Sequence, residues 1–222
     1  YAGGDLVTLA RGGNGKFDPG TRRNFPAAAL GLRKLQGMAI DPSSGRLFLL
    51  DTSGHRLFRL TPDAQGGLDI VAAQRDGRLQ RVDLPALGAG SVRSLAYSAA
   101  SRRLYLLNPA SQTLYELDEN GQIAAAHDLA AAGVALLDPE SMVVAPSGDQ
   151  TDSASKESLY IADSRLGDSL NRSGQVVELT FTQQVAVDGP TVPGYLVRAT
   201  DAFQWATPSS DPMDITYLPA SN

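Results

Sequence analysis

The sequence predicts an all-β protein built from repeated four-stranded antiparallel sheets, and three observations support this prediction. Short segments rich in Leu, Val, Tyr and Phe alternate along the chain with turns rich in Gly, Pro, Ser and Asp. The 222 residues include 22 Gly and 13 Pro, and 42% of them are hydrophobic, which is enough for one substantial core. One pattern of strands and turns also recurs along the chain, so a repeat organises the fold.

The repeat is clearest in its first two copies, which align without a gap. They are GMAIDPSSGRLFLLDTSGHRLFRL, from Gly37 to Leu60, and SLAYSAASRRLYLLNPASQTLYEL, from Ser94 to Leu117. A third copy runs from Ser141 to Leu179 and has the same strands with longer turns. Insertions that are confined to turns are the kind that a framework of strands tolerates.

Each copy contains three strands with different apolar patterns. The first strand is short and apolar (MAI, LAY, MVV), and the second is almost wholly apolar (LFLL, LYLL, LYIA), as in a strand that is buried on both faces. The third strand mixes apolar and charged residues (RLFRL, TLYEL, QVVEL), as in a more exposed strand. Candidate fourth strands follow near Leu79, Ile123 and Tyr195.

Sheets of four strands that recur in this way are typical of the blades of a β-propeller, in which the first strand lines a central channel and the fourth forms the rim. A β-sandwich is the alternative, but its strands need not repeat. Because closed rings have about four to eight blades, we expect an incomplete arc of about three blades, with the remaining blades on the same chain or on another chain. The predicted segment covers residues 1–222, with blades at about 37–84, 94–129 and 141–199, a leading outer strand at 5–10 and a trailing inner strand at 213–218.

Three stretches carry a resemblance to a known family. GMAIDPSSGRLFLLD, DPESMVVAPSGDQTDSASKESLYIADS and SDPMDITYLPASN resemble NHL-type β-propellers, and more narrowly the propeller domains of large secreted or surface bacterial proteins. The resemblance spans nearly the whole chain and implies a secreted or cell-surface (extracellular or periplasmic) location. It leaves the function open, since such propellers include enzymes, binding modules and scaffolds. Gly often follows the acidic residue of DPEG in the wider group, whereas this chain has Ser141 there and Met213 at the counterpart after Asp211-Pro212.

Composition argues against several classes of function. The net charge is -5, and Lys and Arg are scattered instead of forming the basic stripe that nucleic-acid binding needs. The absence of Cys excludes disulfides, thiolate metal sites and Cys nucleophiles, and no apolar run approaches the length of a membrane span. Neither His55 nor His127 neighbours a G-x-S-x-G elbow, and no such elbow occurs, which argues against a Ser/His/Asp triad.

The repeat also predicts a set of candidate metal ligands at one mouth of the channel. The first strand of a meander begins, and the second strand ends, at the same face, so polar residues at these positions should gather there. They are Asp51, Asn108 and Asp163 at the ends of second strands, and Glu140 just before a first strand. Oxygen ligands of this kind suit calcium. Propeller enzymes of the lactonase, esterase and phytase kinds, which the chain resembles, place a metal on such an axis.

A structural role is the alternative for the same residues. Asx side chains that open a turn commonly accept hydrogen bonds from nearby backbone amides, and Glu140 is placed to form a blade-to-blade ion pair with Arg93. The candidate binding residues are Arg93, Trp205 and Phe203. The two aromatic residues precede the last inner strand and form either a platform at the mouth or a cap on the core.

Two functions fit these observations. The first is a non-catalytic binding or scaffold module of an exported bacterial protein, with partner contacts through loops on one face and the long hairpins of the third blade as the main contacts. The second is a calcium-dependent hydrolase of the lactonase, esterase or phytase kind. In that case a metal at the channel mouth, with Glu140 and Asp163 among its ligands, would polarise an ester or phosphate oxygen and activate water. No cofactor other than calcium is expected.

Overall fold

Three four-stranded antiparallel sheets make up most of the structure, which is a computed structural model. It describes residues 5–85, 87, 92–149, 151–164, 174–183 and 193–201. The sheets follow one another along the chain, and strand order within each sheet follows sequence order. The first consists of β3 (Leu35–Ile40), β4 (Leu47–Asp51), β5 (Arg56–Leu60) and β6 (Leu79–Asp83). The second consists of β7 (Arg93–Ser98), β8 (Arg103–Asn108), β9 (Thr113–Leu117) and β10 (Ile123–Asp128). The third consists of β11 (Pro139–Pro146), β12 (Glu157–Asp163), β13 (Gln175–Gln183) and β14 (Pro193–Asp201).

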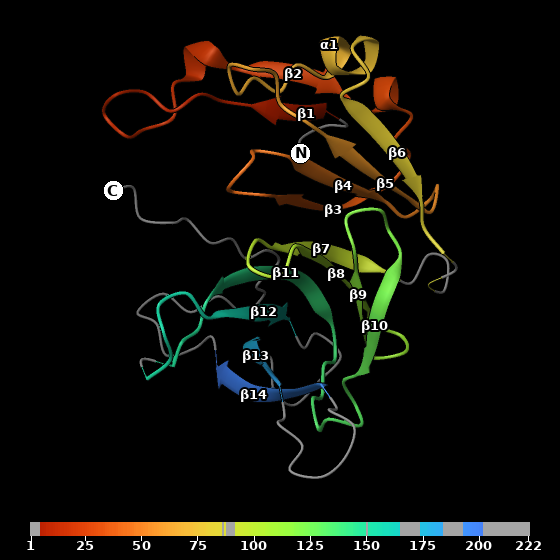
Figure 1. Cartoon of the computed structure of the whole chain (residues 1–222), viewed down its shortest axis with the longest axis vertical. Coiled ribbons are helices and arrows are strands. Elements are labelled where there is room, and N and C mark those ends of the chain that lie inside the picture. The colour runs from red at the N-terminus through yellow and green to blue at the C-terminus, as the bar shows by residue number, and fades with distance from the viewer. Residues whose placement is uncertain are drawn as a thin grey trace.

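The first strands of the three sheets lie side by side. β7 contacts β3 on one side and β11 on the other, and the fourth strands β6, β10 and β14 lie at the far edges of their sheets (Figure 1). This is the arrangement of blades around a propeller axis, with the first strand innermost. The prediction of an all-β fold with propeller blades is therefore confirmed, and the three described sheets form an open arc instead of a closed ring.

In the first two sheets, the second strand is largely buried because it packs against a core on both of its faces. All five residues of β4 are buried. Leu47 and Leu49 belong to the cluster on one side of the first sheet, whereas Phe48 and Leu50 belong to the cluster between the first and second sheets. The continuous apolar run LFLL is explained by this double burial, and an alternating pattern would have left polar side chains inside one of the two cores.

The inner strands approach one another closely at one level of the arc, where the aligned residues are small. A Cβ atom placed on Gly37 would lie 2.7 Å from both the Cβ and the backbone N of Leu95. At the next junction, the backbone N–H of Met142 donates a hydrogen bond of 2.7 Å to Ser94 Oγ. Gly37, Ser94 and Ser141 begin the three aligned copies in the sequence, so the repeat places a small residue wherever two inner strands meet.

Two strands and two 3-10 helices at the start of the chain lie outside the three sheets. β1 (Asp5–Thr8) pairs with β2 (Arg23–Pro26) in a two-stranded sheet, so the strand expected at residues 5–10 has a neighbour that the sequence did not predict. The 3-10 helices η1 (Pro19–Thr21) and η2 (Ala27–Leu30) flank β2. The predicted inner strand at 213–218 lies outside the described residues.

A short helix interrupts the connection between the third and fourth strands of the first sheet. α1 (Ile70–Arg75) begins at Asp69, whose side chain accepts a hydrogen bond from the backbone N–H of Ala72 at 2.9 Å, as is typical of a helix N-cap. Ile70 and Ala73 are the buried residues of the helix and join the core cluster of the first sheet. In the part of the chain that the structure describes, no helix has the length and apolar character needed to span a bilayer.

Candidate functional site

The candidate site is the end of the arc where first strands begin and second strands end. Asp51 closes β4 at this end and is fully buried. Its Oδ1 accepts a hydrogen bond of 3.0 Å from the backbone N–H of Lys34, and its Oδ2 accepts one of 3.3 Å from Arg56. The side chain therefore ties the segment that leads into β3 to the end of β4.

Asn108 and Asp163 hold their sheets in a similar way. Asn108 Oδ1 accepts hydrogen bonds from two N–H groups of the following turn, and its Nδ2 donates to the carbonyl of Leu87 at 3.1 Å. Asp163 is fully buried and accepts hydrogen bonds from the backbone N–H groups of Asp138, at 2.7 Å, and Leu137, at 3.2 Å. It also accepts one of 2.9 Å from Gln175 Nε2.

These contacts support the structural alternative for the three residues, because their side-chain oxygens are directed at backbone N–H groups of their own sheets. Across the described ranges, no group of three or more His, Cys, Asp or Glu residues is arranged to hold a metal ion. Calcium binding at Asp51, Asn108, Asp163 and Glu140 stays a prediction, since a larger ring would add residues to this mouth.

The exposed part of the site is an ion-pair group between the second and third sheets. Arg93 Nη1 lies 3.1 Å from Asp138 Oδ1 and 3.6 Å from Glu140 Oε1, which confirms the predicted ion pair between Arg93 and Glu140. The side chains of Arg93, Asp138 and Glu140 are 44%, 30% and 21% exposed. We call these three residues the rim triad. Asp138 was not among the predicted site residues, although the dipeptide Asp138-Pro139 immediately precedes Glu140.

The backbone is irregular where each inner strand begins. The register between first and second strand shifts between Leu35 and Gly37, between Arg93 and Leu95, and between Pro139 and Ser141. Such bulges turn a side chain away from the regular alternation of a strand. At the second and third positions the shift falls beside Arg93 and at Glu140, so it contributes to the way these two side chains meet.

The other two candidate binding residues, Trp205 and Phe203, lie outside the described residues. The expected contact face also needs correction. The two long hairpins of the third sheet precede and follow β12, so they emerge at opposite ends of that sheet and do not share a face. The end of β12 at Asp163 lies on the same side as the rim triad, whereas its start at Glu157 lies on the other.

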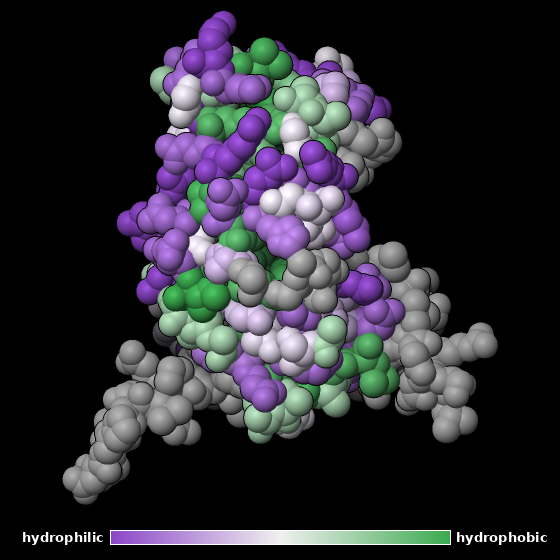
Figure 2. Space-filling view, turned by 90° about the vertical axis from the view of Figure 1, so that its right-hand side faces the viewer, coloured by the Kyte–Doolittle hydropathy of each residue, from purple (hydrophilic) through white to green (hydrophobic). Residues whose placement is uncertain are grey.

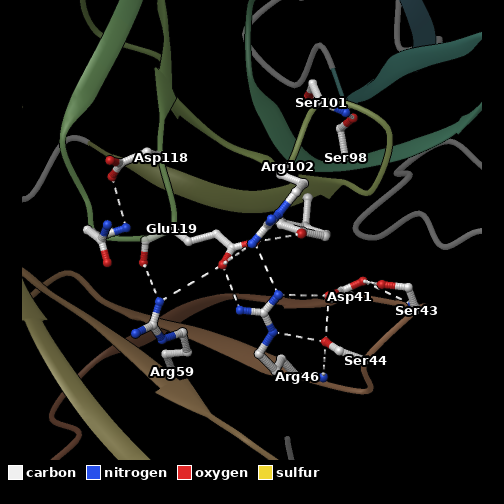
Figure 3. A network of polar contacts seen from close by, with 12 residues as sticks. Asp41, Ser43, Ser44, Arg46, Arg59, Ser98, Ser101, Arg102, Asp118 and Glu119 are labelled. Atoms are coloured by element: carbon white, nitrogen blue, oxygen red, sulfur yellow. Dashed lines mark hydrogen bonds and ion pairs between the residues drawn. The ribbon is translucent and has the colours of Figure 1, made fainter.

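A second polar network joins the first and second sheets at the opposite end of the arc, and the sequence did not predict it (Figure 3). Glu119, in the turn between β9 and β10, reaches across to the first sheet. It forms two bonds to Arg46, of 2.6 and 3.2 Å, and lies 4.0 Å from Arg59. From its own sheet it accepts hydrogen bonds from Tyr97, at 2.9 Å, and Arg102, at 3.3 Å.

The network has clear electrostatic consequences. Burial alone would raise the pKa of Glu119, but the hydrogen bonds from Arg46, Tyr97 and Arg102 outweigh it and leave that pKa below its ordinary value. Burial, together with the bond to Glu119, raises the pKa of Tyr97 to about 12. Asp41 is nearly inaccessible as well, yet hydrogen bonds from Ser43, Ser44 and Arg46 lower its pKa to about 2.

This second network is a structural link between blades. Each Glu119 oxygen has at least two donors, so the hydrogen-bonding capacity of this carboxylate is used within the two sheets. On the face that Figure 2 shows, the described residues are mainly hydrophilic, and apolar residues form separate patches. The rim triad therefore remains the best candidate for contact with another molecule.

Comparison with known proteins supports the fold and does not assign a family. No protein-family model matches the chain, and no curated protein matches it. Among solved structures, the chain resembles one in a nidogen/laminin complex at a TM-score of 0.51 and 14% identity, covering 80% of this chain and 54% of that one. A likeness at this identity shows the fold alone, and the class of protein that fold and site define is a β-propeller.

Two further structures are bacterial. A putative 6-phosphogluconolactonase from Bacteroides uniformis gives a TM-score of 0.46 at 15% identity, over 88% of this chain and 52% of that one. A gluconolactonase from Xanthomonas campestris gives 0.40 at 18% identity, over 66% of this chain and 44% of that one. The chain thus spans about half the length of the solved chains that it matches.

Proposed function

We propose that this chain belongs to a propeller-shaped binding module of an exported bacterial protein, and that the module contacts a protein partner through the rim triad and the loops beside it. The observation that carries the proposal is that the buried polar residues at this end of the arc bind the backbone, whereas Arg93 is exposed. Asp51, Asn108 and Asp163 are committed to the backbone of their own sheets. Arg93 instead presents 44% of its side chain at the surface.

The chemistry of the triad fits recognition of a protein surface. An Arg held between two carboxylates has a fixed position, so less side-chain entropy is lost when its remaining N–H donors bind a partner. Arg is also enriched among the residues that dominate protein interfaces. The solved structure with the 0.51 TM-score is itself a complex of two proteins, which is in keeping with a binding role.

The test is site-specific photo-crosslinking in the living source organism. A photoreactive amino acid replaces Arg93, and a matched control variant carries it at Ala126, which is exposed on the outer strand β10. We expect one defined protein adduct from position 93 and none from position 126. The absence of an adduct at 93, or the same adducts from both positions, would overturn the proposal.

The calcium-dependent hydrolase is the second candidate, because two carboxylates, those of Asp138 and Glu140, are partly exposed at the same rim. Its test is separate: calcium is titrated calorimetrically into the complete protein and into its Glu140→Gln variant. Saturable binding that the variant loses would favour the hydrolase, since a neutral amide is a weaker calcium ligand than a carboxylate. Binding that is absent from both proteins would remove this candidate.

A further inference from the structure

Two large apolar side chains are exposed on the innermost strand of the first sheet. Met38 and Ile40 of β3 are 49% and 54% exposed. They lie opposite Leu49 and Leu47 of β4, so all four share one face of the first sheet. This is the face that points away from the second sheet, because Ala39, which alternates with them, packs into the cluster between the first and second sheets. We call Met38 and Ile40 the β3 ledge.

Three of the four equivalent positions in the other two sheets are buried, and the fourth, Val144, is partly buried and packs against the core between the second and third sheets. Leu95 and Tyr97 of β7 correspond to Met38 and Ile40 in the aligned repeat, and they are 2% and 7% exposed. In the third sheet the position of Met38 is taken by Met142, which is 5% exposed. In each of these cases the preceding sheet covers the face. The β3 ledge is thus the same surface without its cover among the described residues.

The internal interface shows what chemistry covers such a surface. Leu95 and Tyr97 pack in one cluster with Phe48 and Leu50 of β4, and partly buried Ala39 of β3 packs against it. The rings of Phe48 and Tyr97 stack with their centroids 5.1 Å apart. The cover therefore consists of an inner strand with small side chains and a second strand with an aromatic and an aliphatic residue at alternate positions.

Half of the first sheet already has a cover. Leu6 of β1, with Ala27 and Leu30 of η2, joins the cluster that buries Leu47 and Leu49 of β4. The cover thus reaches the second strand of the first sheet and the first residue of β3, Leu35, and stops short of Met38 and Ile40. The β1–β2 pair has two strands where each complete sheet has four.

We propose that β1 and β2 are part of a further four-stranded blade, and that the two innermost strands of this blade cover the β3 ledge in the complete protein. The occupant is a pair of strands with the pattern of β3 and β4: small residues on the inner strand, and an aromatic and a leucine on the second. The inner strand of the further blade packs against Met38 and Ile40. Together with its second strand it buries these two side chains, as β3 and β4 bury Leu95 and Tyr97. This proposal is independent of the proposed function. It concerns the face of the first sheet that points away from the second sheet, whereas the rim triad lies between the second and third sheets.

The test uses two methionines that occupy the same position in different sheets. Met38 is 49% exposed and Met142 is 5% exposed among the described residues. Because peroxide oxidises an exposed methionine faster than a buried one, the ratio of the two oxidation rates shows whether the β3 ledge is covered. The complete protein, purified from its source, is treated with hydrogen peroxide, and sulfoxide formation at each residue is followed by peptide mass spectrometry. We expect Met38 to react less than about fivefold faster than Met142, because both are buried by a neighbouring blade.

The opposing results are equally definite. If Met38 reacts more than about fivefold faster than Met142, the ledge is open and the proposal fails. If Met38 is protected only at high protein concentration, a second copy of the protein covers the ledge and the blade is not the occupant.

A Met38→Lys variant gives an independent test: it should lower the unfolding temperature of the complete protein as far as Met142→Lys does. An unchanged unfolding temperature for Met38→Lys alone would contradict the proposal.

Discussion

Ser94 Oγ, at the start of the inner strand of the second sheet, accepts a hydrogen bond of 2.7 Å from the backbone N–H of Met142 in the third sheet. Ser94 is buried and has a φ of 59°, in the left-handed region that residues other than Gly seldom adopt. A single residue therefore combines backbone strain with a direct link between two blades. Strain of this kind persists only where the surrounding structure fixes it.

Replacement of Ser94 separates the link from the strain. Ser94→Ala removes the acceptor and keeps the strain, so the buried N–H of Met142 loses its partner, and we expect the free energy of unfolding to fall by about 1–3 kcal/mol. Ser94→Gly also loses the acceptor but relieves the strain, and it should recover about 1 kcal/mol relative to Ala. Urea denaturation of both variants measures the difference. An Ala variant as stable as the Gly variant would mean that the strain is negligible.

Gly37 makes the equivalent contact between the first and second sheets by close approach instead of by a hydrogen bond. Gly37→Ala would bring a Cβ to 2.7 Å from two atoms of Leu95, one of them in the backbone, so the inner strands must move apart. We expect a loss of about 1–3 kcal/mol in the free energy of unfolding. Gly13→Ala is the control, since nothing lies within 4 Å of the added Cβ there. Equal stability of the two variants would show that the inner strands separate at no cost.

The sequence predicted those parts of the fold that depend on local pattern. The runs LFLL, LYLL and LYIA predicted strands buried on both faces, and β4 confirms this with five buried residues. The predicted pair of Arg93 and Glu140 followed from the repeat, which places the starts of neighbouring inner strands at one face. The aligned copies carried this information because one register of strands is used in each blade.

What the sequence did not predict depends on contacts between distant residues. Glu119 lies in an ordinary turn, DENGQ, and its role appears only when the first and second sheets bring Arg46 and Arg59 to it. β2 was missed because its four residues, RNFP, are mostly exposed and end in Pro. α1 was missed because a helix of six residues spans too few turns for a clear apolar period, although Asp69 is a typical N-cap.

Glu119 should be the most sensitive residue of the network between the first two sheets. Glu119→Ala leaves Arg46, Arg59 and Arg102 near one another without their shared carboxylate, and the hydroxyl of Tyr97 without its acceptor. We expect a loss of about 3 kcal/mol, because an ion pair broken on one side leaves uncompensated charge.

Arg102→Ala is the matched control for Glu119→Ala. The Arg102 side chain is 70% exposed, so its removal should cost much less stability than removal of Glu119, as for other surface ion pairs. Both variants are compared by urea denaturation at low and high salt. A Glu119→Ala variant that loses no more stability than Arg102→Ala would mean that the network does not hold the two blades together.

Stability in acid should depend on Asp41 in the turn between β3 and β4. Because hydrogen bonds lower its folded pKa from 3.8 to about 2, the folded state favours the carboxylate. The resulting stabilisation is fully present above about pH 4 and is lost as the pH falls through 2. The shift corresponds to about 2 kcal/mol. We expect the unfolding free energy of the wild-type chain to fall over this range and that of Asp41→Asn to fall less.

Asp76→Asn is the control, because Asp76 has an exposed ion pair with Arg75. If the Asp41→Asn and Asp76→Asn variants follow the same pH profile, the turn at Asp41 does not contribute to acid sensitivity, and the carboxylate of Glu119, whose pKa is also lowered, becomes the residue to test.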